Sequence, residues 1–277
     1  MFRWIVAALL FALPVAAGTF SLSQPYVGKV VCYGDSLCNS RVGDWPAALV
    51  SRGMTVGTAG VAGASADLAS SATNSLEAQT INSAGCPSAQ VDVFGDGLID
   101  TCIADISWSS QDVIVIQIGT NDVSAGVASA WDATFGPDYQ TALENVLTEI
   151  ATTPAHCVLL LPIPRADLID DTPDLEKYAL IDTALRARQE AAVAAVGSDC
   201  QIVDTWTPLE NYRLENGDAF FDLFDGANVH ITTTPNSLGD SGVTIIGEHI
   251  RSAIYSMLGR QTPANVCTGP RSFNCPR

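Results

Sequence analysis

Residues 112–122 read DVIVIQIGTND, a short apolar run that ends in a polar turn. Every residue from Val113 to Ile116 is Val or Ile, so the run shows no alternation with polar side chains. That pattern is typical of a strand covered on both faces, as in a parallel sheet between layers of helices. The stretch therefore predicts a buried parallel strand with a polar block, residues 119–122, at its carboxyl end.

Four similar apolar runs lie on either side of this one, at residues 29–33, 54–57, 157–161 and 201–203. Apolar residues at helical spacing predict helices over about residues 137–150, 175–196 and 243–258, and a further helix around Trp45, Pro46 and Leu49. Strands that alternate with helices indicate parallel strands joined by crossover helices. We therefore expect a single α/β/α domain.

The composition indicates a globular protein that does not bind polyanions such as nucleic acid. Of the 277 residues, 47% are hydrophobic and 16% are charged, which argues against intrinsic disorder. The 13 basic and 30 acidic residues give a formal charge of 13 − 30 = −17. Because such a chain repels phosphate backbones and anionic lipids, we expect neither nucleic acid nor a membrane surface as a partner.

Residues 1–17 predict a secretory signal peptide. Arg3 precedes an apolar stretch over residues 4–17 that ends in Val15, Ala16 and Ala17. A stretch this short with small residues at its end is typical of a cleaved signal rather than a membrane anchor. We expect a secreted or periplasmic mature chain that starts near Gly18, with one domain over residues 18–262 and a C-terminal tail over 263–277.

Export makes disulfides the expected state of the eight cysteines, whose spacing matches no zinc motif. One pair joins two predicted strands if these are neighbours, and two pairs close locally. The expected pairs are Cys157 with Cys200, Cys86 with Cys102, and Cys267 with Cys275, which closes the tail; the partners of Cys32 and Cys38 stay open.

Ligands of open parallel sheets bind beyond the carboxyl ends of the strands, so the residues that follow each strand are the candidates for chemistry. Three kinds of group follow the strands: the hydroxyl of Ser36, near a positive helix end, two glycines at which the backbone can come close to a ligand, and the side-chain amide of Asn121. Taken alone, the first block is better explained as an ordinary turn, the second is explained about as well by tight helix–strand packing, and a helix cap is the competing explanation of the third. The blocks are Gly34-Asp35-Ser36-Leu37, Gly60-Val61-Ala62-Gly63 and Gly119-Thr120-Asn121-Asp122.

A serine nucleophile needs a base, and the chain contains only three histidines. His249 lies within the last predicted helix, and His156 opens the fourth strand at its amino end, on the wrong side of the sheet. His230, in the loop before the last helix, is the remaining candidate.

Taken together, these blocks resemble the GDSL, or SGNH, hydrolase family. The residues 34–37, the Gly60-x-x-Gly63 pair, the residues 119–122 and a late Asp-Gly…His at 225–230 follow the order of that family and span most of the mature chain. The resemblance implies a three-layer, flavodoxin-like sandwich with a five-stranded parallel sheet in the order 2-1-3-4-5. It also implies a serine esterase that requires no cofactor.

The resemblance assigns roles by position. Ser36 is the nucleophile and His230 is the general base. The donors of the oxyanion hole are the backbone amides of Ser36 and Gly63 and the side-chain amide of Asn121.

The chain departs from the family at the acid, which usually lies three residues before the histidine. Ala227 occupies that position here. We expect Asp225, five residues before His230, to hold the tautomer of the imidazole, with Asp222 behind it. A Ser–His dyad assisted by a backbone carbonyl is the alternative.

A second motif lies between the second and third predicted strands. Its acidic residues follow the spacing of calcium loops and resemble a thrombospondin type 3 repeat unit, although Phe94 and Ile103 occupy ligand positions. The loop is either a structural Ca²⁺ site or a solvated acidic loop pinned by a disulfide, and in neither case is the metal catalytic. The candidate ligands are Asp92, Asp96, Asp100 and Asp105.

These observations predict a secreted, metal-independent, monomeric serine esterase that forms an acyl-enzyme on Ser36. No long apolar lid segment is evident, so a small-molecule or carbohydrate ester with a short acyl group, such as acetyl, is the expected substrate. One alternative is acyl transfer at the same site. The other is a non-catalytic, calcium-stabilised extracellular binding module, which the Ala227 position favours.

Overall fold

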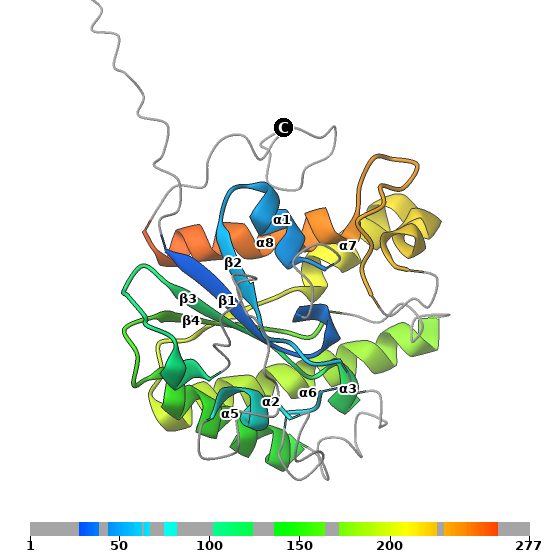
Figure 1. Cartoon of the computed structure of the whole chain (residues 1–277). Coiled ribbons are helices and arrows are strands. Elements are labelled where there is room, and N and C mark those ends of the chain that lie inside the picture. Colours follow the sequence, from blue (N-terminus) through cyan, green and yellow to red (C-terminus); the bar gives the residue numbers. More distant parts are fainter. Residues whose placement is uncertain are drawn as a thin grey trace, which may run out of the picture.

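The computed structural model describes residues 28–38, 44–62, 64–66, 75–81, 102–123, 136–163, 172–225 and 230–259. Five strands form one parallel sheet in the order β2-β1-β3-β4-β5 (Figure 1). The sheet confirms both the five predicted strands and the strand order. The strands are β1 (Lys29–Gly34), β2 (Thr55–Thr58), β3 (Val113–Gln117), β4 (His156–Leu160) and β5 (Gln201–Val203).

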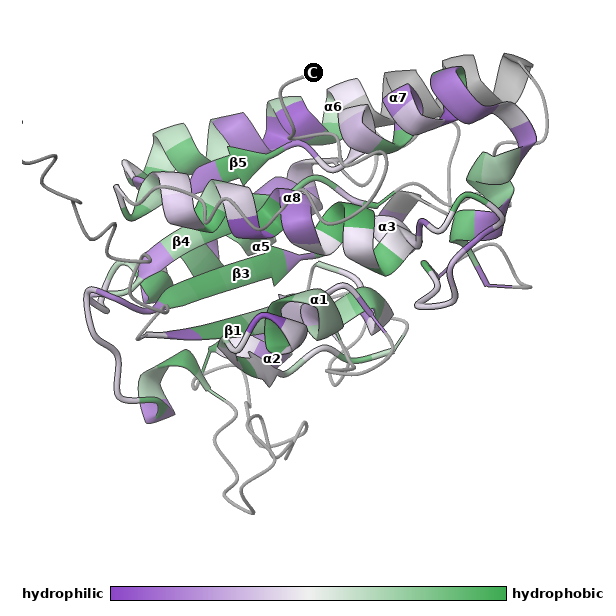
Figure 2. Cartoon of the chain, turned by 90° about the horizontal axis from the view of Figure 1, so that it is seen from above, coloured by the Kyte–Doolittle hydropathy of each residue, from purple (hydrophilic) through white to green (hydrophobic). Residues whose placement is uncertain are grey.

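The central strand β3 is buried along its whole length, and most of its arrow has the apolar colour in Figure 2. Successive side chains of a strand point to opposite faces of the sheet. Val113 and Val115 accordingly enter one hydrophobic core, and Ile114 and Ile116 enter the other. The absence of polar alternation in this stretch therefore follows from burial on both faces.

Helices cover the two faces of the sheet and make three layers (Figure 1). One face packs against α1 (Pro46–Ser51), α7 (Trp206–Asn216) and α8 (Gly242–Met257). The other face packs against α2 (Leu76–Thr80), α5 (Gly136–Ile150) and α6 (Thr172–Val196). The shorter helices are η1 (Ser36–Cys38), η4 (Ile103–Asp105), α3 (Thr120–Val123) and η7 (Gly217–Leu223).

The long helices α5, α6 and α8 lie close to the predicted ranges, but the first helix does not. The sequence predicts that the turn at Ser36 enters a helix that contains Trp45. The structure instead has the short η1 at Ser36 and a separate α1 that begins at Pro46, with Trp45 as its N-terminal cap residue. Proline is favoured at the first helical position because its missing N–H has no helical partner there.

Two disulfides are described. Cys157 pairs with Cys200, with Cα atoms 4.5 Å apart, as predicted for neighbouring strands. Cys32 pairs with Cys38, with Cα atoms 5.8 Å apart, which assigns the two residues that the spacing left open.

Several predictions fall outside the described residues and remain predictions. They concern the signal peptide, the disulfide of the C-terminal tail, the partner of the disulfide-bonded Cys102, and most of the acidic loop. Among the helices that the structure describes, none combines the length and apolar character needed to cross a bilayer. The predicted site and cysteine residues that lie outside the described ranges are Gly63, Cys86, Asp92, Asp96, Asp100, Ala227, Cys267 and Cys275.

Candidate active site

The turn that follows β1 presents Ser36 at the carboxyl edge of the sheet. Gly34 ends the strand with φ 145°, a backbone conformation that favours glycine. The backbone amide of Asp35 then donates to the carbonyl of Gln117 on β3 at 3.0 Å, and the amide of Cys38 donates back to the carbonyl of Asp35 at 3.1 Å. These bonds fix the turn and leave Ser36, the first residue of η1, half-buried.

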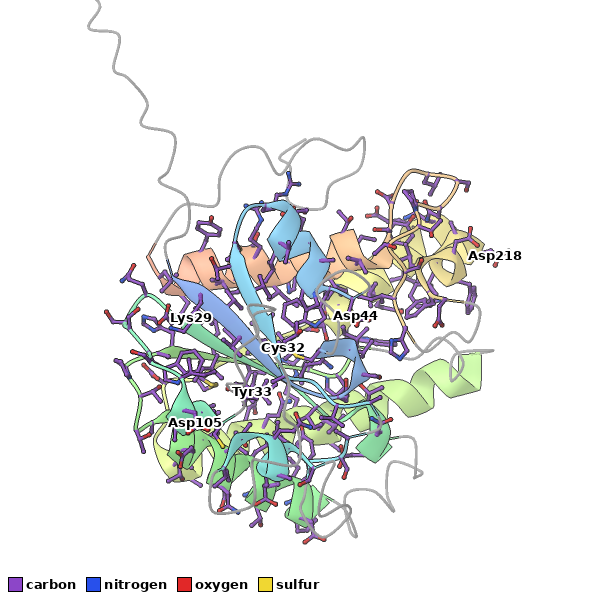
Figure 3. The ribbon with its side chains drawn as sticks, viewed as in Figure 1. Lys29, Cys32, Tyr33, Asp44, Asp105 and Asp218 are labelled. Carbon is purple, nitrogen blue, oxygen red and sulfur yellow. A yellow bond between two sulfur atoms is a disulfide. The ribbon has the colours of Figure 1, made fainter. Side chains whose placement is uncertain are left out.

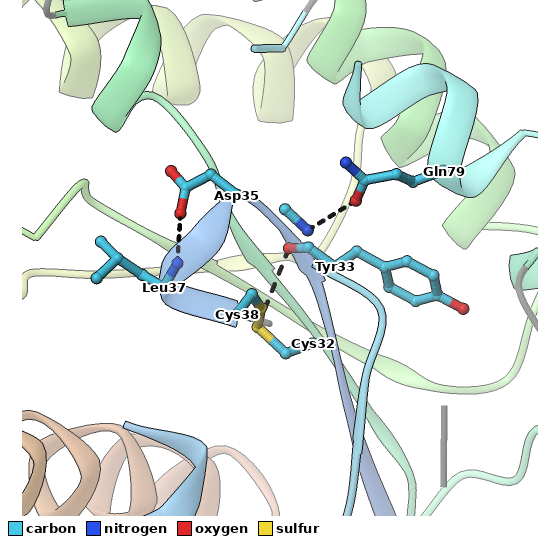
Figure 4. Close-up of a disulfide and its surroundings, with 7 residues drawn as sticks. Cys32, Tyr33, Asp35, Leu37, Cys38 and Gln79 are labelled. Atoms are coloured by element: carbon cyan, nitrogen blue, oxygen red, sulfur yellow. Dashed lines mark hydrogen bonds between the residues drawn. A yellow bond between two sulfur atoms is a disulfide. The ribbon is translucent and has the colours of Figure 1, made fainter. Parts of the chain in front are cut away.

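The carboxyl group of Asp35 lies beneath this turn and is fully buried. Its Oδ1 atom accepts a hydrogen bond from the backbone amide of Leu37 at 3.0 Å (Figure 4). Burial raises the pKa of Asp35 to about 7, and the nearby charge of Asp122 adds to this, while the bond from Leu37 opposes it. A carboxyl group that ionises near neutral pH therefore lies beside Ser36 in the sequence.

The Cys32–Cys38 disulfide spans the turn that carries Ser36. Figure 4 shows the bridge between Cys32, within β1, and Cys38, at the end of η1, and both cysteines are fully buried. Gly60, from the segment after β2, presses on the same turn, because a Cβ atom at this position would lie 2.6 Å from the carbonyl carbon of Cys38. Gly60 thus serves close packing against the turn.

Asn121 links the end of β3 to the segment that follows β2. Its Nδ2 atom donates to the carbonyl of Ala64 at 2.9 Å, and the neighbouring Asp122 accepts from the amide of Ala66 at 3.1 Å. The described residues 64–66 directly follow Gly63. Asn121 is therefore held beside the segment in which the sequence places the second oxyanion donor.

His230 is positioned by backbone contacts with Asp225. The amide of Asp225 donates to the carbonyl of His230 at 2.7 Å, and the amide of His230 lies 3.4 Å from Oδ1 of Asp225. An antiparallel bridge between Phe224 and Ile231 extends this pairing. The carboxylate of Asp225 therefore contacts the backbone of His230.

The imidazole of His230 contacts a different carboxylate. Its Nδ1 atom lies 3.4 Å from Oδ1 of Asp44, a buried residue two positions before α1. This hydrogen bond raises the pKa of His230 above its ordinary value; partial burial opposes the rise, and the charges of Asp44, Asp225 and Asp35 add to it. The contact with Asp44 holds the imidazole next to the start of α1.

The structure places Ser36 and Asn121 just beyond the carboxyl ends of the neighbouring strands β1 and β3, and it places His230 against Asp44 and Asp225. It does not bring Asp105 to these residues, because this exposed residue of η4 lies toward the Lys29 end of β1, away from Asp44 (Figure 3). Within the described ranges, no cluster of three or more His, Cys, Asp or Glu could hold a metal ion.

Two other predicted positions agree with the structure. His156 opens β4, and His249 lies in α8, where burial lowers its pKa. Asp222 is exposed on η7. Sequence reasoning missed Asp44 because the residue lies 186 positions from His230, and no local pattern marks that contact.

The comparisons with known proteins identify the family and the fold. The model of the GDSL-like lipase/acylhydrolase family matches residues 32–234. No curated protein matches the sequence. The fold is similar to that of an acetyl xylan esterase, with 19% identity, a TM-score of 0.51, and coverage of 81% of this chain and 98% of that one.

Two further solved structures share the fold. One is a protein from Bacillus subtilis, with 15% identity, a TM-score of 0.51, and coverage of 85% of this chain and 58% of that one. The other is a gut microbial diltiazem-metabolizing enzyme, with 15% identity, a TM-score of 0.52, and coverage of 82% of this chain and 46% of that one. At these identities the similarity establishes a common fold.

Proposed function

Because the chain belongs to the GDSL-like lipase/acylhydrolase family, we propose that it is an exported serine esterase that cleaves carboxylic esters through an acyl-enzyme on Ser36. One observation carries the proposal. The Nδ1 atom of His230 contacts the buried carboxylate of Asp44, the arrangement expected of an imidazole that serves as a general base. The opposite ring nitrogen, Nε2, is then the atom that acts as the base.

In the first half of the reaction, the Oγ atom of Ser36 attacks the ester carbonyl and His230 Nε2 takes the hydroxyl proton. Negative charge develops on the carbonyl oxygen. The backbone amides of Ser36 and Gly63 and the side-chain amide of Asn121 donate to that oxygen, and fixed donors of this kind need no reorganisation. The tetrahedral intermediate collapses, the alcohol leaves with the proton from His230, and the acyl group stays on Ser36.

In the second half, water attacks the acyl-enzyme and gives a proton to His230. The ester bond to Ser36 breaks, the carboxylic acid leaves, and His230 returns the proton to Oγ. No step needs a metal ion. Any Ca²⁺ bound by the acidic loop at Asp92, Asp96, Asp100 and Asp105 would be structural.

The proposed substrates carry short acyl groups, with acetyl esters of carbohydrates as the first class to test. The sequence has no long apolar insertion of the kind that would shelter a long acyl chain. The fold shared with an acetyl xylan esterase is consistent with this choice.

The test is hydrolysis of p-nitrophenyl acetate by the mature protein and by Ser36→Ala, in calcium and in chelator. We expect hydrolysis to vanish in Ser36→Ala and to be indifferent to the chelator. A series of p-nitrophenyl esters tests the acyl group, and a marked preference for long chains over acetate would contradict the proposed substrate class. Products formed with added sugar alcohols distinguish hydrolysis from acyl transfer.

A further inference from the structure

His230 has two carboxylate neighbours, and they contact different atoms. Oδ1 of Asp225 accepts from the backbone amide of His230 at 3.4 Å. Asp44 places Oδ1 at 3.4 Å from Nδ1 of the imidazole. Only a carboxylate at the ring can select the tautomer that leaves Nε2 as the base.

We propose that Asp44, from the segment between the Ser36 turn and α1, is the positioning residue that holds the His230 imidazole in its reactive tautomer and offsets the charge that the ring gains. This inference rests on the proposed esterase function. It replaces Asp225, the carboxylate expected from the sequence, in that role.

The two carboxylates differ in solvent exposure, and Asp44 is the more buried. The side chain of Asp44 is 8% exposed, whereas Asp225 lies at the surface. A charge interaction is stronger where water is excluded. The imidazole itself is 35% exposed, so it remains accessible from the solvent side.

Asp44 lies next to a tightly packed part of the fold. Its carbonyl accepts from the amide of Ala47 at 2.9 Å, at the start of α1. Trp45, the next residue, is fully buried. Helix α8 packs tightly on this segment, because a Cβ atom on Gly247 would lie 2.9 Å from the carbonyl oxygen of Trp45. A site residue carried by a packed element holds its geometry better than one on a loop.

Asp225 has a different task at the base of the His230 loop. It pairs with His230 through backbone contacts beside the Phe224–Ile231 bridge. Two residues more than the family spacing separate it from the histidine. The carboxylate of Asp225 contacts the backbone amide of His230 and not its ring.

Electrostatics agrees with the geometry. The carboxylates that act on the imidazole are Asp44, Asp225 and Asp35, and the hydrogen bond that the ring makes to Asp44 is the largest cause that raises the pKa of His230. Removal of the Asp44 charge should therefore lower this pKa more than removal of the Asp225 charge does.

The experiment compares Asp44→Asn with Asp225→Asn and with Asp199→Asn, a charge-matched control at an exposed position before β5. For p-nitrophenyl acetate we expect Asp44→Asn to lower kcat by about 10² to 10⁴ with little change in KM, since an amide at this position favours the wrong tautomer. Asp225→Asn should cost at least about tenfold less, and Asp199→Asn should match the parent protein.

A proton NMR titration of the His230 ring supplies a readout that a purely structural role would not move. The chain has only three histidines, so comparison with His230→Gln identifies the signal. In Asp44→Asn we expect a lower pKa for His230, and the acidic limb of the kcat/KM profile should move to lower pH with it. Asp44→Glu, which keeps the charge, should retain part of the activity and of the raised pKa.

Three results would overturn the inference. The first is a large loss of kcat in Asp225→Asn while Asp44→Asn keeps its activity. The second is a loss in Asp44→Asn with the pKa of His230 unchanged. The third concerns Asp44→Glu and is needed if Asp44→Asn does not fold. It is a folded Asp44→Glu protein in which the pKa of His230 has fallen to its ordinary value. If Ser36→Ala stays active, the esterase proposal fails, yet the titration still reports whether Asp44 holds the ring.

Discussion

Asp35 is a fully buried carboxyl group beside the proposed nucleophile, and burial raises its pKa from 3.8 to about 7. The folded state therefore keeps a proton that the unfolded state loses between pH 4 and pH 7. Unfolding free energy must fall as pH rises through this window, because the unfolded state binds fewer protons there. The contribution is of the order of 4 kcal/mol, since each pKa unit corresponds to about 1.4 kcal/mol.

The corresponding prediction concerns Asp35→Asn, which keeps an oxygen for the Leu37 amide and cannot ionise. Relative to the parent protein, this variant should gain stability as pH rises from 4 to 8, by about 4 kcal/mol. Urea unfolding at several pH values measures the difference. Parallel stability curves for the two proteins would show that Asp35 does not titrate in this range.

Asn121 gives a second prediction at this scale. As an oxyanion donor it should matter most in the transition state, so Asn121→Ala should lower kcat by about 10² to 10³ and change KM little. Steady-state hydrolysis of p-nitrophenyl acetate checks this. A rise in KM with kcat unchanged would assign Asn121 to substrate binding alone. Its bond to Ala64 makes far-ultraviolet circular dichroism and a melting curve necessary controls for folding.

At the scale of the elements, the two described disulfides separate stability from activity. Cys32–Cys38 closes a short loop around Ser36, while Cys157–Cys200 joins the start of β4 to the residue before β5, at the opposite edge of the sheet. Loop-closure entropy predicts that the first contributes about 2 kcal/mol and the second about 4 kcal/mol.

We therefore expect the two double variants to rank in opposite orders for unfolding free energy and for kcat. The paired Cys157→Ala and Cys200→Ala variant should lose more unfolding free energy yet keep its kcat at a temperature where it is folded. The paired Cys32→Ala and Cys38→Ala variant should be the more stable of the two and lose at least about tenfold in kcat, because the nucleophile turn loosens. Equal kcat values for both variants would rule out a positioning role for the short bridge.

The same scale shows what the sequence could predict. The strands were predictable because runs such as Val113 to Ile116 are buried on both faces of a parallel sheet. Helix α7 was not predicted, because among its residues only Leu209 and Tyr212 are buried, which gives no continuous apolar stripe. Ser36 could be identified from a local motif. The contact of Asp44 with His230 joins residues 186 positions apart and exists only in the folded chain.

At the scale of the whole molecule, the formal charge of −17 predicts discrimination against anionic substrates. A negative potential lowers the local concentration of anions, and added salt screens it. For a neutral and an anionic p-nitrophenyl ester of similar size, kcat/KM should favour the neutral ester at low ionic strength, and the ratio should fall as salt is added. A ratio independent of salt would mean that the site is shielded from the overall charge.

The proposed function of the whole molecule depends on Ser36 being an activated nucleophile. The turn after β1 carries Ser36 at the carboxyl edge of the sheet, and His230, the proposed base, pairs with the buried carboxylate of Asp44. Labelling with a fluorophosphonate, followed by mass spectrometry of the peptide over residues 29–52, tests this most directly. We predict one label per chain, on Ser36, with labelling lost in Ser36→Ala and strongly slowed in His230→Gln. A folded protein that takes up no label, or takes it up equally in Ser36→Ala, would contradict the account.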